Sequence, residues 1–228
     1  MIKSPTEGII LIDKPSGKTS FYLVSLLRKL TQVKKIGHAG TLDPLATGVM
    51  VLLVGKKYTK LSNQFLTHDK SYHVKIQLGA ISDSYDADGQ ITKVENSSIP
   101  SLADITSALK SFQGEIEQRP PMYSAKKVGG KKLYELARQG VEIERKLQQI
   151  KVTTLLKSYT YPYLELAIDC SKGTYIRSIA HDLGQKLGCG GFVVNLIRTR
   201  SGPFTLEQCL SFETLLESKG DLIIHTTY

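Results

Sequence analysis

Apolar runs and polar segments alternate in the first third of the chain, and their spacing predicts two strands and two helices. Continuous apolar runs at 8–12 and 49–54 predict short buried strands. Between them, apolar residues with helical spacing follow Thr19 and Ser20, and either hydroxyl is suited to cap that helix. These apolar residues are Leu23, Leu26, Leu27 and Leu30. A further helix is predicted at 56–66, where the apolar pattern is weaker.

A strand at 72–78 is predicted by strict alternation, which places every second residue on the core face. Tyr72 is the first residue of that face, and the pattern alone favours a buried core aromatic there. Residues 90–94 predict another strand. A capping-box variant at Ser101 then predicts a helix with an apolar stripe, which ends at Gly114.

The last third of the chain predicts a half-buried strand at 164–168, a helix carrying apolar residues over 176–187, a long strand at 192–200 and a short helix that begins at Ser211. Arg177 lies near the start of the first of these helices. A cation there opposes the helix dipole, so Arg177 needs an anionic partner.

Residues 119–151, here called the basic excursion, interrupt this series of elements. A Pro-Pro pair at 120–121, a Gly-Gly turn at 129–130 and a short helix at 133–138 leave few residues to bury. Four lysines flank the turn, and they are Lys126, Lys127, Lys131 and Lys132. The pattern predicts a surface excursion from the main sheet that adapts to a partner.

Charge is distributed unevenly along the 228 residues, whose net charge is +9 and whose pI is about 9.3. Residues 1–60 carry a net +7 and the basic excursion +6, whereas 61–118 carry −4 and 152–228 are neutral. Two basic segments that are separate in the sequence could bind one polyanion at two places. Solvated lysines that keep the protein soluble explain the composition equally well.

Several classes of protein lack their sequence signatures here. The chain shows no apolar run of membrane-spanning length and no signal peptide. Its three cysteines have no CxxC spacing, which predicts a reduced, cytoplasmic protein without zinc. The dinucleotide-binding, zinc-protease and serine-hydrolase motifs GxGxxG, HExxH and GxSxG are missing as well.

Two segments resemble binding loops but fail in detail. Gly17-Lys18-Thr19 matches the end of a phosphate-binding P-loop, as in a nucleotidase, yet Ile12 occupies the place of the first glycine. Residues 84–95 match part of a calcium loop, yet Ser84 replaces its first aspartate and predicted strands replace its flanking helices. The second segment is therefore expected to be an acidic turn between strands.

The most distinctive segment is Gly37-His38-Ala39-Gly40-Thr41-Leu42-Asp43-Pro44-Leu45-Ala46-Thr47-Gly48, here called the Asp43 loop. Its glycines permit unusual backbone shapes, and Pro44 moves Asp43 away from helical geometry. A carboxylate in such a place can act as a nucleophile or stabilise a cationic sugar centre. Taken alone, however, Asp43 is more typical of a turn aspartate before proline.

The Asp43 loop resembles the central motif of the TruB-type tRNA pseudouridine synthases, in their bacterial branch. Five further motifs occur in the family's order, namely Asp13-Lys14-Pro15-x-Gly17, Lys70-x-Tyr72, Asp86-Ala87-Asp88-Gly89, Pro121-Met122-Tyr123-Ser124-Ala125 and Ser171-Lys172-Gly173-Thr174-Tyr175-Ile176-Arg177. The resemblance covers about residues 8–202. It implies an α+β fold with a mixed, mainly antiparallel central sheet flanked by helices, in one catalytic domain over 1–228 with the basic excursion as an insertion.

Three residues match the family's catalytic positions. The resemblance implies that Asp43 is the catalytic aspartate, that Tyr72 packs against the target base and can accept its proton, and that Arg177 pairs with the aspartate. Such an arginine would also supply the partner that its place in the helix demands.

Five more residues match positions that bind the substrate. By the same resemblance, Tyr175 and Leu196 line the target pocket, and His38 fills the space left by flipped bases. Asp86 lies near the flipped segment, and Lys14 supports the Asp43 loop.

The implied reaction isomerises uridine 55 in the T loop of tRNA to pseudouridine after flipping the base. Asp43 can add to C1′, add to C6 or assist a glycal route, and each route uses one ionised carboxylate. The reaction is redox-neutral, so no cofactor or metal is expected. The basic excursion matches a thumb-like insertion that closes on the T arm, with its four lysines on the RNA backbone, and we expect 120–135 to become ordered on RNA.

Many bacterial relatives carry an RNA-binding domain of the PUA type after the core, whereas this sequence ends at Tyr228. We therefore expect a stand-alone, monomeric enzyme that uses no guide RNA and binds no membrane. The alternative is a non-catalytic factor that folds the tRNA T arm, which the presence of Asp43, Tyr72 and Arg177 disfavours.

Overall fold

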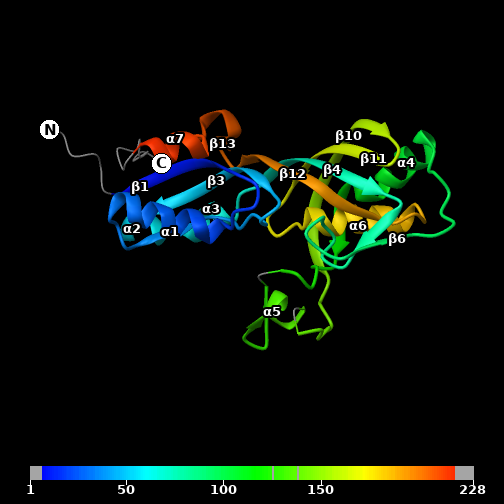
Figure 1. Ribbon diagram of the computed structural model, residues 1–228, viewed down its shortest axis with the longest axis horizontal. Helices are drawn as coiled ribbons and strands as arrows, with labels where there is room; N and C mark the ends of the chain where they lie inside the picture. Colours follow the sequence, from blue (N-terminus) through cyan, green and yellow to red (C-terminus); the bar gives the residue numbers. More distant parts are fainter. Residues whose placement is uncertain (1–6, 125, 138, 219–228) are drawn as a thin grey trace. The chain divides into compact units, whose positions relative to one another are not determined.

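The computed structural model describes residues 7–124, 126–137 and 139–218. The chain divides into two compact units. The terminal unit comprises 1–73 and 196–228, and the central unit comprises 74–195. Figure 1 shows the elements coloured along the sequence. None of the described helices combines the length and the apolar character needed to cross a membrane.

The terminal unit is built around two buried strands. Its strands are β1 (Gly8–Lys14), β2 (Ile36–His38), β3 (Thr47–Val54), the end of β12 (Gly191–Ser201) and β13 (Phe204–Thr205). β1 runs antiparallel to β3 over its full length, and β2 also pairs with β3. The end of β12 lies parallel to the start of β3, with Arg198 opposite Gly48. Both continuous apolar runs are buried strands, as predicted.

Short helices complete the terminal unit. They are α1 (Ser20–Thr31), α2 (Gly55–Thr59), α3 (Ser62–Leu66), the 3₁₀ turn η2 (Leu206–Gln208) and α7 (Phe212–Glu217). The hydroxyl of Thr19 accepts a hydrogen bond from the amide of Tyr22, so Thr19 rather than Ser20 caps α1. The single helix predicted at 56–66 is instead two helices separated by residues 60–61, and both Tyr58 and Phe65 pack into one core cluster.

The central unit contains the rest of the sheet. Its strands are the end of β4 (Lys70–Leu78), β7 (Gly114–Gln118), β10 (Gln148–Thr160), β11 (Tyr163–Cys170) and the start of β12. Within this unit the order is β12-β4-β11-β10-β7, and β10 is antiparallel to both of its neighbours. Alternate residues of β4, β10 and β11 are buried, which leaves the other face of β10 largely exposed. The predicted alternation at 72–78 is confirmed.

Two strands of this sheet, β7 and β10, have no counterpart in the pattern described above. β10 begins at Gln148, so the sheet includes the last four residues of the basic excursion. A register shift between Leu156 and Ser158 interrupts its alternation. Polar residues at its exposed positions further weaken the apolar signal. A separate hairpin of β5 (Ala80–Ser82) and β6 (Ile91–Lys93) holds the acidic turn between strands, as expected.

Helices α4 (Leu102–Leu109) and α6 (Ile176–Lys186) pack together in the central unit, and the 3₁₀ turn η1 (Lys110–Phe112) follows α4. Ser101 and Asp104 form the capping box that the sequence predicted. In the basic excursion, β8 (Lys127–Val128) and β9 (Lys131–Lys132) form a hairpin that leads into α5 (Leu133–Ala137). Figure 1 shows the segment around α5 extending away from the sheet of its own unit. The mixed, mostly antiparallel sheet with helices confirms the α+β class.

Candidate active site

The Asp43 loop lies in the terminal unit, where it includes the end of β2, the connection that follows and the start of β3. The side chain of Asp43 is half-buried, and the backbone carbonyl of Asp43 accepts a hydrogen bond of 3.1 Å from the amide of Ala46. This bond closes a tight turn over 43–46, which Pro44 favours. The turn leaves the carboxylate partly accessible while its backbone is constrained.

Lys14 holds the loop from the end of β1. The side chain is fully buried, and its ammonium group donates hydrogen bonds to the carbonyls of Pro15, Lys18 and Pro44 at 2.8, 2.7 and 3.1 Å. A buried ammonium needs such partners, because burying it without them is costly. Lys14 therefore joins the segment after β1 to the residue that follows Asp43.

The Gly17-Lys18-Thr19 segment and the start of α1 also hold the loop. The amide of Gly17 donates to the carbonyl of Pro44 at 2.8 Å. The hydroxyl of Ser20 accepts from the amide of Leu42 and donates to its carbonyl, at 2.9 and 3.0 Å. Ser20, which the sequence offered as a helix cap, instead fixes the residue that precedes Asp43.

Arg198 on β12 contacts the chain on both sides of Asp43, at Gly40 and Thr41 within the loop and at Val49 directly after it. No motif in the sequence includes Arg198. Its guanidinium donates to the carbonyl of Val49 at 2.8 Å, of Gly40 at 3.2 Å and of Thr41 at 3.5 Å. The side chain is 1% exposed. The sequence signal for it is weak, because Asn195, Thr199 and a second cation, Arg200, lie on the same strand.

His38 lies at the end of β2, at the start of the Asp43 loop. Burial, and next the positive charge of Arg198, lower the pKa of His38 from its usual 6.5. The imidazole is therefore neutral at neutral pH. Its Nδ1 atom is buried and has no hydrogen-bond partner among the described residues.

Tyr72 and Leu196 are the other predicted site residues of the terminal unit. Tyr72 lies on the alternating buried face of β4 and is 9% exposed, and Leu196 on β12 is 5% exposed. Next to Tyr72, the hydroxyl of Ser71 accepts a hydrogen bond of 2.9 Å from Arg200. The burial of Tyr72 fits a core aromatic and a ring packed beside a substrate base equally well, so it does not distinguish these two roles.

The central unit holds a second buried cluster around Arg177, in the first turn of α6. Its guanidinium forms an ion pair of 3.4 Å with the carboxylate of Asp86. It also donates to the carbonyls of Ser84 and Tyr123, both at 2.7 Å. Asp86 thus offsets the unfavourable helix dipole within this unit. The pairing of Arg177 with Asp43 that the family resemblance implies stays a prediction.

Tyr175 directly precedes α6 and is held by a glutamine at the end of β7. The side chain of Gln118 accepts from the amide of Tyr175 at 2.8 Å and donates to its carbonyl at 2.9 Å. The hydroxyl of Ser178 donates to the carbonyl of Arg119 at 3.0 Å. The start of α6 and the first residue of the basic excursion are therefore fixed together.

Comparisons with known proteins agree with this arrangement of motifs. Residues 28–176 match the profile described as "TruB family pseudouridylate synthase (N terminal domain)". Residues 177–221 match the "tRNA pseudouridylate synthase B C-terminal domain". The chain belongs to the TruB family of pseudouridylate synthases.

Relatives of the chain within the TruB family are similar over most of their length. "tRNA pseudouridine synthase B" of Protochlamydia amoebophila (strain UWE25) is 62% identical, over 91% of this chain and 79% of the relative. The proteins of the same name from Chlamydia pneumoniae and Clostridium acetobutylicum (strain ATCC 824) are 55% and 48% identical. Those alignments cover 97% and 92% of this chain, and 91% and 73% of the relatives.

Solved structures share the fold. A chain of a Cbf5-Nop10-Gar1 complex matches with a TM-score of 0.73 at 29% identity, covering 93% of this chain. A chain of an H/ACA RNP bound to a substrate RNA containing 2′-deoxyuridine matches with a TM-score of 0.69 at 27% identity, covering 92% of this chain. The chain spans about half the length of each, 54% and 52%.

The basic excursion of this TruB-family chain offers one described lysine side chain among the four proposed to contact RNA. The ammonium of Lys126 is 3.4 Å from the side-chain oxygen of Gln148, at the start of β10. The side chains of Lys127, Lys131 and Lys132 lie outside the described part of the structure. Their backbone forms the β8–β9 hairpin.

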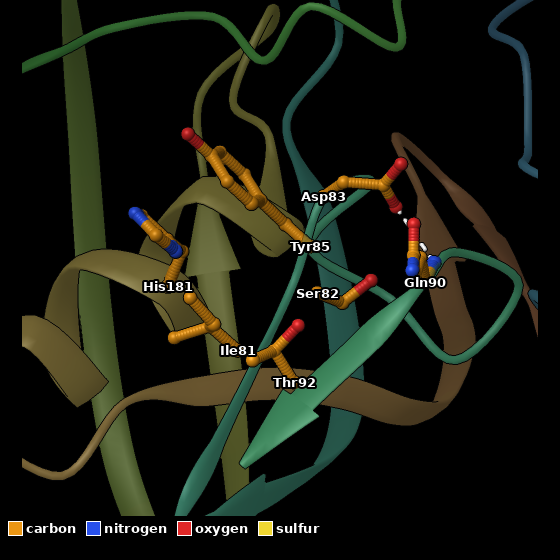
Figure 2. A pocket seen from close by; sticks show the side chains of 7 residues that line it. All are labelled: Ile81, Ser82, Asp83, Tyr85, Gln90, Thr92 and His181. Atoms are coloured by element: carbon orange, nitrogen blue, oxygen red, sulfur yellow. Dashed lines mark hydrogen bonds between the residues drawn. The ribbon is translucent and has the colours of Figure 1, made fainter. Parts of the chain in front are cut away.

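A pocket of about 270 Å³ opens in the central unit (Figure 2). Its wall is the ring of Tyr85, which stacks on His181 at 3.8 Å with 11° between the planes. Tyr85 has a φ of 66° and lies between Ser84 and Asp86, which contact Arg177. None of the residues proposed for the site lines this pocket, which consists of Ile81, Ser82, Asp83, Tyr85, Gln90, Thr92 and His181. No sequence motif indicated it.

Proposed function

We propose that this protein is a tRNA pseudouridine synthase that converts uridine 55 in the T loop of tRNA to pseudouridine. The observation that carries the proposal is the Asp43 loop, which presents one half-buried carboxylate on a backbone gripped by buried cations. The chain belongs to the TruB family and is 62% identical to a protein named tRNA pseudouridine synthase B, and both findings support the same conclusion. A fixed, ionised carboxylate suits each route open to Asp43, namely addition to C1′, addition to C6 or a glycal route.

The reaction rearranges bonds within one nucleoside. The glycosidic bond between N1 and C1′ breaks, the detached base turns within the pocket, and C5 forms a new bond to C1′. The hydrogen at C5 then leaves as a proton, and N1 takes one up, so the product is an isomer of the substrate. The ionised carboxylate of Asp43 assists the cleavage at the sugar.

Other residues orient the base and the loop. In the proposed site Tyr72 packs on the flipped uracil and accepts the proton from C5, while Tyr175 and Leu196 enclose the base. Arg177 orients the Asp43 carboxylate. Further support comes from His38, which occupies the space vacated by flipped bases, from Asp86, which lies near that segment, and from Lys14, which holds the Asp43 loop.

Most contacts with RNA are expected outside the site around Asp43. We assign the contacts with the phosphates of the T arm to the basic excursion, which carries a net +6 within a chain of net charge +9. In this proposal the enzyme acts as a monomer, without a guide RNA, in the cytoplasm where its tRNA substrate resides.

The test uses the purified chain and a tRNA transcript carrying tritium at C5 of its uridines, with no other RNA added. The wild-type protein is expected to release tritium to water, and sequencing for pseudouridine should locate the product at position 55. Asp43→Asn should abolish release and change the affinity for tRNA by less than about threefold. Asp88→Asn, which alters an exposed carboxylate of the acidic turn, is the matched control and should release tritium normally.

The same experiment separates this proposal from a non-catalytic factor that folds the T arm. Such a factor would bind tRNA tightly and release no tritium. Release by Asp43→Asn at the wild-type rate would instead leave a synthase whose catalytic group is not Asp43.

A further inference from the structure

Arg198 is a buried cation with an unusual set of partners. The described residues give it three backbone carbonyls, of Gly40, Thr41 and Val49, and no ion pair with a carboxylate. Burying a guanidinium is costly, and neutral carbonyls offset that cost less well than a carboxylate would. A substitution by an apolar residue of similar size would avoid the cost, so stability alone is a weak reason for an arginine here.

The three carbonyls lie on both sides of Asp43 in the chain. Gly40 and Thr41 precede the carboxylate, and Val49 follows it at the start of the buried part of β3. One planar guanidinium therefore spans both ends of the segment that carries Asp43. A lysine has no fork of donors and cannot reproduce this geometry.

The backbone of Arg198 also fits closely against the loop. Arg198 pairs with Gly48 in the parallel register of β12 and β3. A Cβ atom at Gly48 would lie 2.2 Å from the carbonyl oxygen of Arg198, so only glycine permits this approach. The side chain of Arg198 is thereby delivered to the chain on both sides of Asp43 by the strand pairing itself.

We propose that Arg198 is a positioning residue of the reaction: its guanidinium clamps the chain on both sides of Asp43 and so sets the direction of the Asp43 carboxylate. Because Arg198 is 1% exposed, it acts through the loop and not by contact with RNA. The inference rests on the proposed function, since it concerns the same carboxylate. It adds a second clamp, from β12, to the one that Lys14 supplies from β1.

The proposal has a consequence for His38, which lies two residues before Gly40. The charge of Arg198 is one of the two causes that lower the pKa of His38, the larger being burial. Removing the guanidinium should therefore raise the pKa of His38 towards 6.5 while the histidine stays in place. A residue that only filled space would have no such effect.

The test compares Arg198→Met, Arg198→Lys and the control Arg28→Met. Arg28 also donates to a backbone carbonyl of β2, that of Ile36 at 3.1 Å, but Ile36 precedes the first residue of the Asp43 loop. Single-turnover tritium release at saturating enzyme, tRNA affinity, thermal midpoint and the NMR-detected pKa of His38 are measured for each. We expect Arg198→Met to lower the single-turnover rate by about 100-fold and affinity by less than about threefold.

Arg28→Met should keep its rate within about threefold of wild type even where its thermal midpoint falls as much as that of Arg198→Met. Arg198→Lys keeps the charge without the span, so its rate should fall about tenfold while the pKa of His38 stays low. If Arg198→Met does not fold, the single-turnover rate of Arg198→Lys tests the proposal instead. A wild-type rate in either Arg198 variant, or equal losses in Arg28→Met, overturns the proposal. No release by the wild-type protein would instead overturn the proposed function.

Discussion

The Asp43 loop and the basic excursion both combine glycine with nearby cations, yet their backbones are held in opposite ways. Side chains from three separate elements bind the Asp43 loop, namely those of Lys14, Ser20 and Arg198. In the hairpin of the basic excursion the described backbone bonds join near neighbours, such as the amide of Leu133 and the carbonyl of Lys126, and Lys126 adds a long contact to Gln148. In the proposed function, one region fixes a carboxylate and the other follows an RNA surface.

The root of the basic excursion is the exception, since it is anchored on the Arg177 cluster. The carbonyl of Tyr123 accepts from Arg177, and the hydroxyl of Tyr123 contacts the carboxylate of Asp83 at 3.3 Å. Beyond the root, the exposed fractions of Val128 and Val141 are 40% and 43%. Adaptability is therefore expected in the hairpin and not where the excursion joins the sheet.

Glycines offer the sharpest contrast between the two regions. Gly48 and Gly129 both have positive φ, of 101° and 57°. A Cβ at Gly48 would collide with the backbone of Arg198, whereas one at Gly129 would meet nothing within 4 Å. Gly48→Ala should lower the free energy of unfolding by more than about 3 kcal/mol, and Gly129→Ala by about 1 kcal/mol. Urea unfolding measures both, and equal losses would contradict the difference in packing.

Lys14→Met tests whether the clamp on the Asp43 loop serves the chemistry. The substitution removes the donor to three carbonyls and leaves an unbranched side chain that is one atom shorter. We expect single-turnover tritium release to fall by about 100-fold with tRNA affinity nearly unchanged. Lys18→Met, which alters an exposed lysine beside Tyr22, is the matched control. A rate near that of the control would show that the loop keeps its shape without Lys14.

Neutralising the basic excursion should have the reverse effect. Replacing Lys126, Lys127, Lys131 and Lys132 together by Gln removes charge from the hairpin only. We expect tRNA affinity to fall by about 30-fold. The slope of log affinity against log salt concentration should become less negative by up to about 3. Single-turnover release at saturating enzyme should stay within about threefold. If the salt dependence of tRNA affinity is unchanged, these four lysines do not contact the RNA phosphates.

The smallest expected effect concerns pH and the Asp43 loop. The pKa of His38 is lowered by burial and then by Arg198, so the unfolded chain binds a proton at a pH where the folded chain does not. Stability should therefore fall as the pH drops below about 6.5. His38→Gln should reduce this fall, as measured by thermal midpoints from neutral to mildly acidic pH. The control His73→Gln, on the exposed face of β4, should retain it.

Local patterns predicted much of the fold. A cap of α1 at Thr19 or Ser20, the alternation of β4 and the capping box at Ser101 were all readable, because each signal lies within a few residues. Which of the two hydroxyls caps α1 was left open by the sequence. β7 and β10 were not predicted, since β7 is short and polar and a register shift interrupts β10. Their pairing joins residues that are far apart in the sequence, where no local pattern reports it.

The site was predictable only in part for the same reason. The motifs that the family resemblance identified include Lys14, which holds the Asp43 loop, and Asp86, which pairs with Arg177. They do not include Arg198 or Ser84. Arg198 reaches Gly40 across 158 positions, and Arg177 reaches Ser84 across 93. Side chains that bind backbone carbonyls at such separations place no constraint on residue type at the other end, so the sequence carries no trace of the partner.

Hydrogen exchange with and without tRNA compares the two regions in one measurement. The amides of Leu42 and Gly48, which donate to Ser20 and Asp13, should be protected in the free protein and change little when tRNA binds. Amides of residues 126–137 should exchange faster in the free protein and gain protection only with tRNA. Protection of the hairpin that is the same with and without tRNA, or an Asp43 loop that becomes protected only on binding, would contradict the account.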